Sequence, residues 1–224
     1  MKYIPLFFAL LSNLCYAQNN KNVYSFDHLL EYEYREEKNS KPKTIFYLTN
    51  SKINGFYIRA EKRKEIGDSM YVKFIDFTGR TYSSFDVIEE DFILEDFLLN
   101  CSIVYKLRNF NTWRSTQYQV VQEKDTVIDD REHQAFVLKI EKEKREKRRK
   151  LCRYHTILEK NTSYHLAPLL FPIAYEEYKA NKSIPNGIPR IIYDSNHFQN
   201  DHHFYELKKI SRINKLIQIT GDCN

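Results

Sequence analysis

Apolar and polar residues alternate along the chain just after its N-terminal stretch. Between residues 26 and 34, one face of a two-residue repeat carries aromatic and apolar side chains and one histidine, namely Phe26, His28, Leu30, Tyr32 and Tyr34. The other face is mostly charged and carries Asp27, Leu29, Glu31, Glu33 and Arg35. Because successive side chains of a strand point to opposite faces, this pattern predicts a half-buried β-strand.

Four further short strands are predicted before residue 90, each separated from the next by a turn. They are expected at residues 44–49, 56–60, 70–76 and 81–87. The pair Asn54-Gly55 predicts a type I′ hairpin turn, because both residues tolerate a positive φ. The later turns are marked by the pairs Gly67-Asp68 and Thr78-Gly79. Strands joined by such short turns predict an antiparallel meander.

The rest of the chain continues the strand pattern and adds one helix. Residues 89–99 predict a short irregular or helical connection, and a helix is expected at 166–182, with Pro168 and Pro172 near its start. A proline costs little there, because the first N–H groups of a helix have no partner within the helix. The remaining strands are expected at 101–106, 118–121, 135–140, 151–158 and 188–193, with a last strand or pair of strands at 205–219.

The first seventeen residues have the features of a secretory signal peptide. Lys2 precedes a short apolar run that is too short to span a bilayer as a helix. Cys15 and Ala17 fit the small-x-small rule for cleavage, which predicts a cut after Ala17 and a mature chain that begins at Gln18. Lipidation at Cys15 remains an alternative, although Leu14 before it fits that reaction poorly. The protein is therefore expected to be exported, periplasmic or secreted, with no transmembrane segment.

Composition supports one β-rich domain over residues 18–224. Without the 17 N-terminal residues, 207 of the 224 remain, which suits one substantial domain. The 17 Tyr and 15 Phe residues favour pleated, half-buried surfaces. The predicted fold is therefore mainly β (α+β), a curved antiparallel sheet or half-barrel with one packed helix. The formal net charge of +5 is mild and its charges are interleaved, which argues against a nucleic-acid partner.

Three cysteines remain after the predicted cleavage, which permits at most one disulfide within the chain. In an exported protein such a bond persists. We favour Cys101–Cys223, because the C-terminal tail needs tethering, with Cys152 free. Three reduced, buried thiols are the alternative. Cys152 follows the basic residues 148–150, which would lower the pKa of its thiol if it were exposed.

Two clusters of charged or metal-binding residue types stand out, but both predict ordinary surface structure. The basic stretch 139–153 is expected to be a solvated turn or a short charged helix. Residues 194–206, which contain three histidines, are expected to form a polar surface loop. The sequence has no Gly-x-Ser-x-Gly elbow, no glycine-rich phosphate loop and no zinc-type spacing. We therefore expect no catalytic residue, cofactor or metal ligand, and the protein is expected not to be an enzyme.

Two segments and the C-terminal cysteine carry a family resemblance. YLTNSKINGFYI at 47–58, SYHLAPLLFPIAYEEYKANKSIPNGI at 163–188 and Cys223 resemble a family of uncharacterised exported bacterial proteins. At the level of the fold, a curved sheet under a helix resembles the periplasmic lipoprotein-carrier half-barrel, which implies a binding or carrier domain for an apolar or lipid-like ligand. The alternative is a structural or protein-interaction domain whose core is filled by its own side chains. The sequence sets no oligomeric state.

Overall fold

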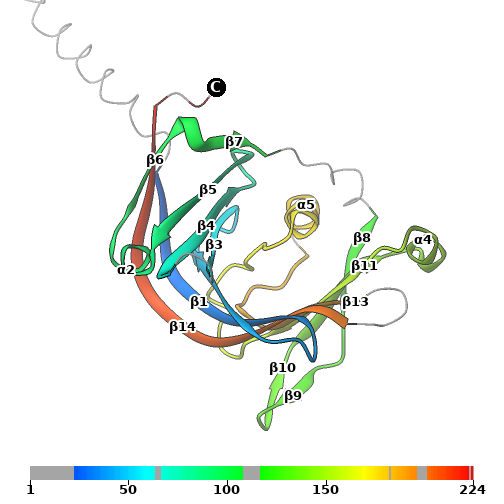
Figure 1. The fold of residues 1–224 in the computed structure, drawn as a ribbon. Helices are drawn as coiled ribbons and strands as arrows, with labels where there is room; N and C mark the ends of the chain where they lie inside the picture. Colours follow the sequence, from blue (N-terminus) through cyan, green and yellow to red (C-terminus); the bar gives the residue numbers. More distant parts are fainter. Residues whose placement is uncertain are drawn as a thin grey trace, which may run out of the picture.

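A twelve-stranded sheet dominates the structure, a computed structural model that describes residues 23–63, 67–107, 117–181, 183–195, 201–221 and 223. The sheet curves strongly and stays open, so that it forms a half-barrel with a concave and a convex face (Figure 1). This confirms the mainly β fold with a curved antiparallel sheet that the sequence predicts. The predicted signal peptide and the cut after Ala17 lie outside the described residues.

The first half of the sheet is the predicted meander, in the order β5-β4-β3-β2-β1. Every neighbouring pair in it is antiparallel. Its strands are β1 (Val23–Glu37), β2 (Lys43–Thr49), β3 (Phe56–Lys62), β4 (Ser69–Asp76) and β5 (Thr81–Ile88). On β1 the alternation holds, because Phe26, His28, Leu30 and Tyr32 are all buried.

The second half of the sheet continues from β14 (Asp201–Thr220), which pairs with β1 from Val23 opposite Gln218 to Glu37 opposite His202. This long pair joins the two halves of the sheet and runs along the spine of the half-barrel (Figure 1). The segment predicted as a last strand or pair is thus one long strand. Beyond it lie β13 (Pro189–Ser195), β12 (Arg153–Leu158), β11 (Ala135–Ile140) and β8 (Tyr118–Gln122).

Short elements complete the edges of the sheet. The helix α2 (Glu89–Leu94) precedes β6 (Phe97–Asn100), which pairs in parallel with β14. The predicted strand at 101–106 is in part wrong, because a 3₁₀ turn, η2 (Cys101–Ile103), comes before β7 (Val104–Lys106), and the Asn100 side chain accepts from the backbone N–H of Ser102 at this turn. A separate hairpin is formed by β9 (Thr126–Ile128) and β10 (Arg131–His133). Within the described parts of the chain, no helix is long and apolar enough to cross a membrane.

Two longer helices accompany the sheet. The helix α5 (Pro172–Asn181) lies on the concave side, and α4 (Glu143–Arg149) lies outside the sheet edge near β11 (Figure 1). The basic stretch is thus a short charged helix, one of the two expected forms. Glu146 on α4 is buried, and its carboxylate accepts from Arg153 Nε at 2.7 Å. This ion pair holds α4 against the start of β12.

The predicted start of the packed helix at residue 166 is wrong. Residues 165–171, here named the strap, have no regular secondary structure, and α5 begins only at Pro172. A residue that precedes proline is disfavoured in helical conformation, and both Ala167 and Phe171 precede one. The strap also buries Leu169 and Leu170 among apolar side chains of the sheet.

The predicted type I′ turn at Asn54-Gly55 is also wrong. The connection from β2 to β3 covers residues 50–55, and neither Asn54 nor Gly55 has a positive φ. Asn50 organises this loop instead, because its side-chain oxygen accepts from the backbone N–H groups of Lys52 and Ile53. An Asx-type turn of this kind competes with a two-residue hairpin.

Candidate functional site

The strap crosses the concave face and is tied to both halves of the sheet. The backbone N–H of Leu166 donates to the carbonyl of Ser51 at 2.9 Å, and Tyr57 on β3 donates from its hydroxyl to the carbonyl of Leu170 at 3.0 Å. At the other end, the rings of Phe171 and Tyr154 on β12 lie with centroids 5.0 Å apart. The strap therefore covers the inner surface that a ligand of a half-barrel would use.

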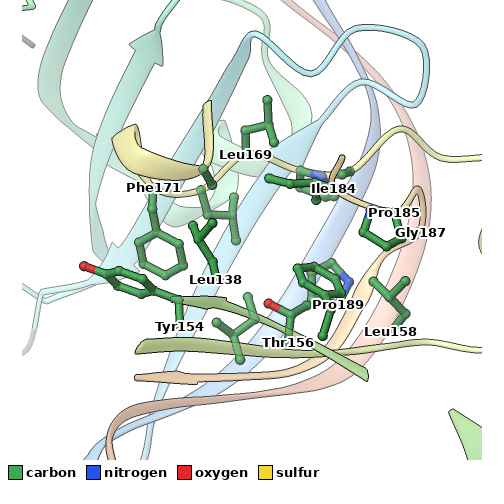
Figure 2. Close-up of a pocket in the computed structure, with 16 residues that line it drawn as sticks. Leu138, Tyr154, Thr156, Leu158, Leu169, Phe171, Ile184, Pro185, Gly187 and Pro189 are labelled. Atoms are coloured by element: carbon green, nitrogen blue, oxygen red, sulfur yellow. The ribbon is translucent and has the colours of Figure 1, made fainter. Parts of the chain in front are cut away.

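An apolar pocket lies between the strap, α5 and the second half of the sheet (Figure 2). Figure 2 shows Tyr154, Thr156 and Leu158 from the sheet on one side of the pocket, opposite Leu169 of the strap and Ile184. The complete lining is Phe136, Leu138, Tyr154, Thr156, Leu158, Ala167, Pro168, Leu169, Leu170, Phe171, Ala174, Ile184, Pro185, Gly187, Pro189 and Ile192. Sixteen residues without a charged side chain form a surface that favours an apolar group.

The pocket is small in this conformation. Its cavity volume is about 40 Å³, which is the space of a few water molecules. Leu169 and Leu170 fill much of the concave surface, since both are buried against the sheet. A longer apolar chain therefore fits only if the strap and α5 move away from the sheet.

A second pocket is larger but polar. It has a volume of about 270 Å³ and is lined by Ile128, Asp129, Arg131, His133, Glu159 and Arg190. Arg190 already contacts Asp129 Oδ2 at 3.4 Å and Glu159 Oε2 at 3.7 Å. These ion pairs make this pocket a network of matched charges, which suits an apolar ligand poorly.

The histidine-containing segment 194–206 is largely strand where it is described. Asp194 and Ser195 end β13 and residues 201–206 begin β14, while 196–200 lie outside the described residues. The predicted polar loop is therefore wrong for residues 201–206, because they pair with β1 and β13. His203 stacks on Tyr34, and their Nδ1 and hydroxyl oxygen lie 2.7 Å apart.

The structure has the favoured cysteine pair and a thiol at Cys152. Cys101 and Cys223 form a disulfide with Cα atoms 5.0 Å apart, which ties the C-terminal tail to η2. Cys152 is half-buried, and burial together with the nearby carboxylates of Asp194 and Glu146 raises the pKa of its thiol. The lowered pKa was expected only for an exposed thiol, and this condition is not met because Cys152 is half-buried.

The sequence did not predict the apolar pocket between the strap, α5 and the sheet. It also did not predict a cluster of three residues of metal-binding types. Asp27, His28 and His165 come together although His165 is far away along the chain. Their only sequence signal is that His28 occupies a buried-face position of the first predicted strand. Pro168 and Pro172 were visible in the sequence, but residues 166–171 were predicted to be the start of the helix.

Comparisons with known proteins support the fold class alone. No family model matches the chain, and no curated protein matches it. Among solved structures, MucB is 9% identical with a TM-score of 0.40 over 91% of this chain, which spans 57% of the MucB chain. A putative outer membrane lipoprotein-sorting protein domain from Vibrio parahaemolyticus is 8% identical with a TM-score of 0.33 and 91% coverage of both chains.

A third solved structure of this kind is a LolA superfamily protein from Nitrosomonas europaea. It is 9% identical with a TM-score of 0.29 and covers 84% of this chain and 85% of that chain. All three likenesses are distant, with at most 9% identity and TM-scores of at most 0.40. The resemblance to uncharacterised exported proteins stays a prediction.

Proposed function

We propose that the protein is an exported binding or carrier domain that takes an apolar or lipid-like ligand between the strap, α5 and the sheet. The observation that carries this proposal is the uncharged pocket beneath the strap, which sixteen residues line. Burial of apolar ligand surface there contributes roughly 25 cal/mol per Å². Tyr154 and Thr156 are the side chains of the lining that offer a hydroxyl group to a ligand.

Ligand entry would exchange one set of apolar contacts for another. Leu169 and Leu170 of the strap occupy the surface that an acyl chain would cover, so in the absence of a ligand they make the apolar contacts that the chain would make. If the strap moves out as the chain moves in, the sheet keeps a similar area of apolar contact. This motion would break the hydrogen bonds that tie the strap to the rest of the chain, such as those from Leu166 N–H to the Ser51 carbonyl and from the Tyr57 hydroxyl to the Leu170 carbonyl.

Export is part of this proposal and rests on two observations. The first is the signal-peptide pattern that ends at Ala17. The second is the disulfide between Cys101 and Cys223, since disulfides persist in oxidising compartments such as the periplasm. Both support a protein of the cell envelope rather than of the cytosol.

The second candidate is a structural or protein-interaction domain with a self-filled core. The cavity volume of about 40 Å³ favours it, because the strap already fills most of the concave face. In this case the strap is a permanent part of the core and no small molecule enters.

The two candidate functions differ in whether an apolar molecule co-purifies with the protein. The mature chain would be purified from the envelope fraction, extracted with organic solvent, and the extract analysed by mass spectrometry. A stoichiometric lipid or other apolar molecule supports the carrier proposal. An extract without such a molecule, together with no uptake of added fatty acid, supports the self-filled domain.

A further inference from the structure

Two buried histidines and one aspartate meet where the strap joins the first half of the sheet. Asp27 and His28 belong to β1, and His165 begins the strap. One donor atom from each of the three lies within 4.8 Å of the others. The two imidazole rings are 5.0 Å apart between centroids and nearly perpendicular. None of the three residues lines the apolar pocket.

The first histidine presents a buried nitrogen without a hydrogen-bond partner. His28 Nδ1 lies 2.8 Å from Asp27 Oδ1. An ionised carboxylate only accepts hydrogen bonds, so Nδ1 carries the proton and Nε2 of the neutral ring carries the lone pair. His28 is 4% exposed, and its Nε2 is a buried atom with no hydrogen bond among the described residues. Such an atom is costly to leave unpaired.

The second histidine is oriented in the same way. His165 is fully buried, and its Nδ1 lies 2.6 Å from the carbonyl oxygen of Leu166. The carbonyl accepts, so Nδ1 donates and Nε2 again carries the lone pair. Thr49 Oγ1 lies 3.0 Å from this Nε2 and donates its hydroxyl proton to it. A hydroxyl can rotate away and present its own lone pair.

Both rings thus have the arrangement of metal-binding histidines. Such a histidine donates its other ring N–H to a carboxylate or a backbone carbonyl, which fixes the free nitrogen toward the ion. The carboxylate of Asp27 has this role for His28, and the carbonyl of Leu166 has it for His165. Asp27 is itself held by the backbone N–H of Ser51 at 2.8 Å.

We propose that His28 and His165 bind one divalent transition-metal ion through their Nε2 atoms, with Asp27 as the orienting carboxylate. Two imidazoles with oxygen donors suit Zn²⁺, Co²⁺, Ni²⁺ or Cu²⁺ rather than Ca²⁺ or Mg²⁺. Water completes the set of donors. The cluster lies near the surface, because the Asp27 side chain is 40% exposed and the ring of the exposed Tyr164 lies 5.9 Å from the His28 ring.

Such an ion would fasten the strap to β1, since its two ligands come from these two elements. The metal site does not depend on the proposed carrier function, because its ligands lie outside the apolar pocket. Failure of one proposal therefore leaves the other standing.

The test measures metal binding to the untagged mature chain. Isothermal titration with Zn²⁺ should give one ion per chain, and Co²⁺ should give the visible absorption of a bound ion with nitrogen ligands. His28→Gln and His165→Gln should each abolish this binding. His203→Gln is the matched control, because His203 stacks on Tyr34 outside the cluster, and it should bind like the wild type.

Two further variants keep the test decisive if a histidine variant does not fold. Asp27→Asn should weaken binding about 10-fold to 100-fold, the usual effect of losing an orienting partner. Thr49→Val should keep the site, because it removes only the hydroxyl that competes for His165. Wild-type affinity in both His28→Gln and Asp27→Asn, or no binding of any of the four ions by the wild type, overturns the proposal.

Discussion

Tyr57 donates a hydrogen bond from its hydroxyl to the carbonyl oxygen of Leu170, and this contact links β3 to the strap at 3.0 Å. Both residues are buried, so water does not replace the bond in the folded state. Burial raises the pKa of Tyr57 well above its ordinary value, which keeps the hydroxyl protonated as a donor. The contact lies far from either end of the chain and couples the meander to the segment that covers the concave face.

Loss of this bond should loosen the strap. Tyr57→Phe keeps the ring but leaves the Leu170 carbonyl unpaired, so we expect the free energy of unfolding to fall by about 1–3 kcal/mol. Urea unfolding measures the change. The control is Tyr105→Phe, since Tyr105 is exposed and this change should stay within about 0.5 kcal/mol. Equal stability of both variants would contradict the importance of this contact.

Removal of the disulfide should destabilise the whole domain. Cys101 and Cys223 are separated by 122 residues, so the bond restricts a long loop of the unfolded chain. Cys223→Ser should lower the free energy of unfolding by about 2–5 kcal/mol. Cys152→Ser is the control, because Cys152 is a free cysteine. This variant keeps the disulfide, so it should not lose the stabilisation that the disulfide gives by restricting the unfolded chain. Identical unfolding of the wild type with and without a reductant would refute the prediction.

The stability of the first half of the sheet should decrease in acid through Glu61. Burial acts to raise the pKa of its carboxyl, but hydrogen bonds and charge from Lys43 and Arg59 outweigh burial, and the pKa lies below its ordinary value of 4.5. The unfolded chain therefore binds the proton first as the pH falls. The stabilisation is present above that ordinary value and is lost as the pH falls through the folded pKa.

Glu61→Gln should remove this part of the acid sensitivity. Its cost at neutral pH should be at most about 1 kcal/mol, because the Glu61 side chain is 22% exposed and water screens the pair. Unfolding followed from neutral to acid pH measures the effect, with the exposed Glu90→Gln as the control. If the free energy of unfolding of Glu61→Gln falls with pH as steeply as that of the wild type, the pairs with Lys43 and Arg59 do not contribute to acid sensitivity.

The mass of the exported chain tests the N-terminal prediction. The chain isolated from the envelope should begin at Gln18 and be lighter than the reduced form by the mass of one hydrogen molecule, because one disulfide forms. Intact-mass spectrometry before and after reduction gives both numbers. A mass that includes residues 1–17 would contradict signal cleavage, and a lipid adduct on Cys15 would favour the alternative of lipidation.

The sequence predicted the sheet well because local alternation determines it. Phe26, Leu30 and Tyr32 alternate with charged residues, and this pattern survives in β1. The strap was not predicted, because Pro168 and Pro172 were placed near the start of a helix and because the burial of Leu169 and Leu170 depends on tertiary contacts. The meeting of His28 with His165 was also invisible, since it depends on where the strap crosses β1 and not on any spacing along the chain.

The central claim is that the pocket under the strap admits an apolar ligand, and a matched pair of substitutions on α5 tests it most directly. Ala174 lines the pocket and Ala180 is exposed, so Ala174→Phe fills the site while Ala180→Phe changes the same helix outside it. The measurement is a fluorescence titration with a naturally fluorescent polyene fatty acid. We expect the wild type and Ala180→Phe to bind alike and Ala174→Phe to bind at least about tenfold more weakly, about 1.4 kcal/mol. Equal binding by all three proteins, or no binding by the wild type, would contradict the account.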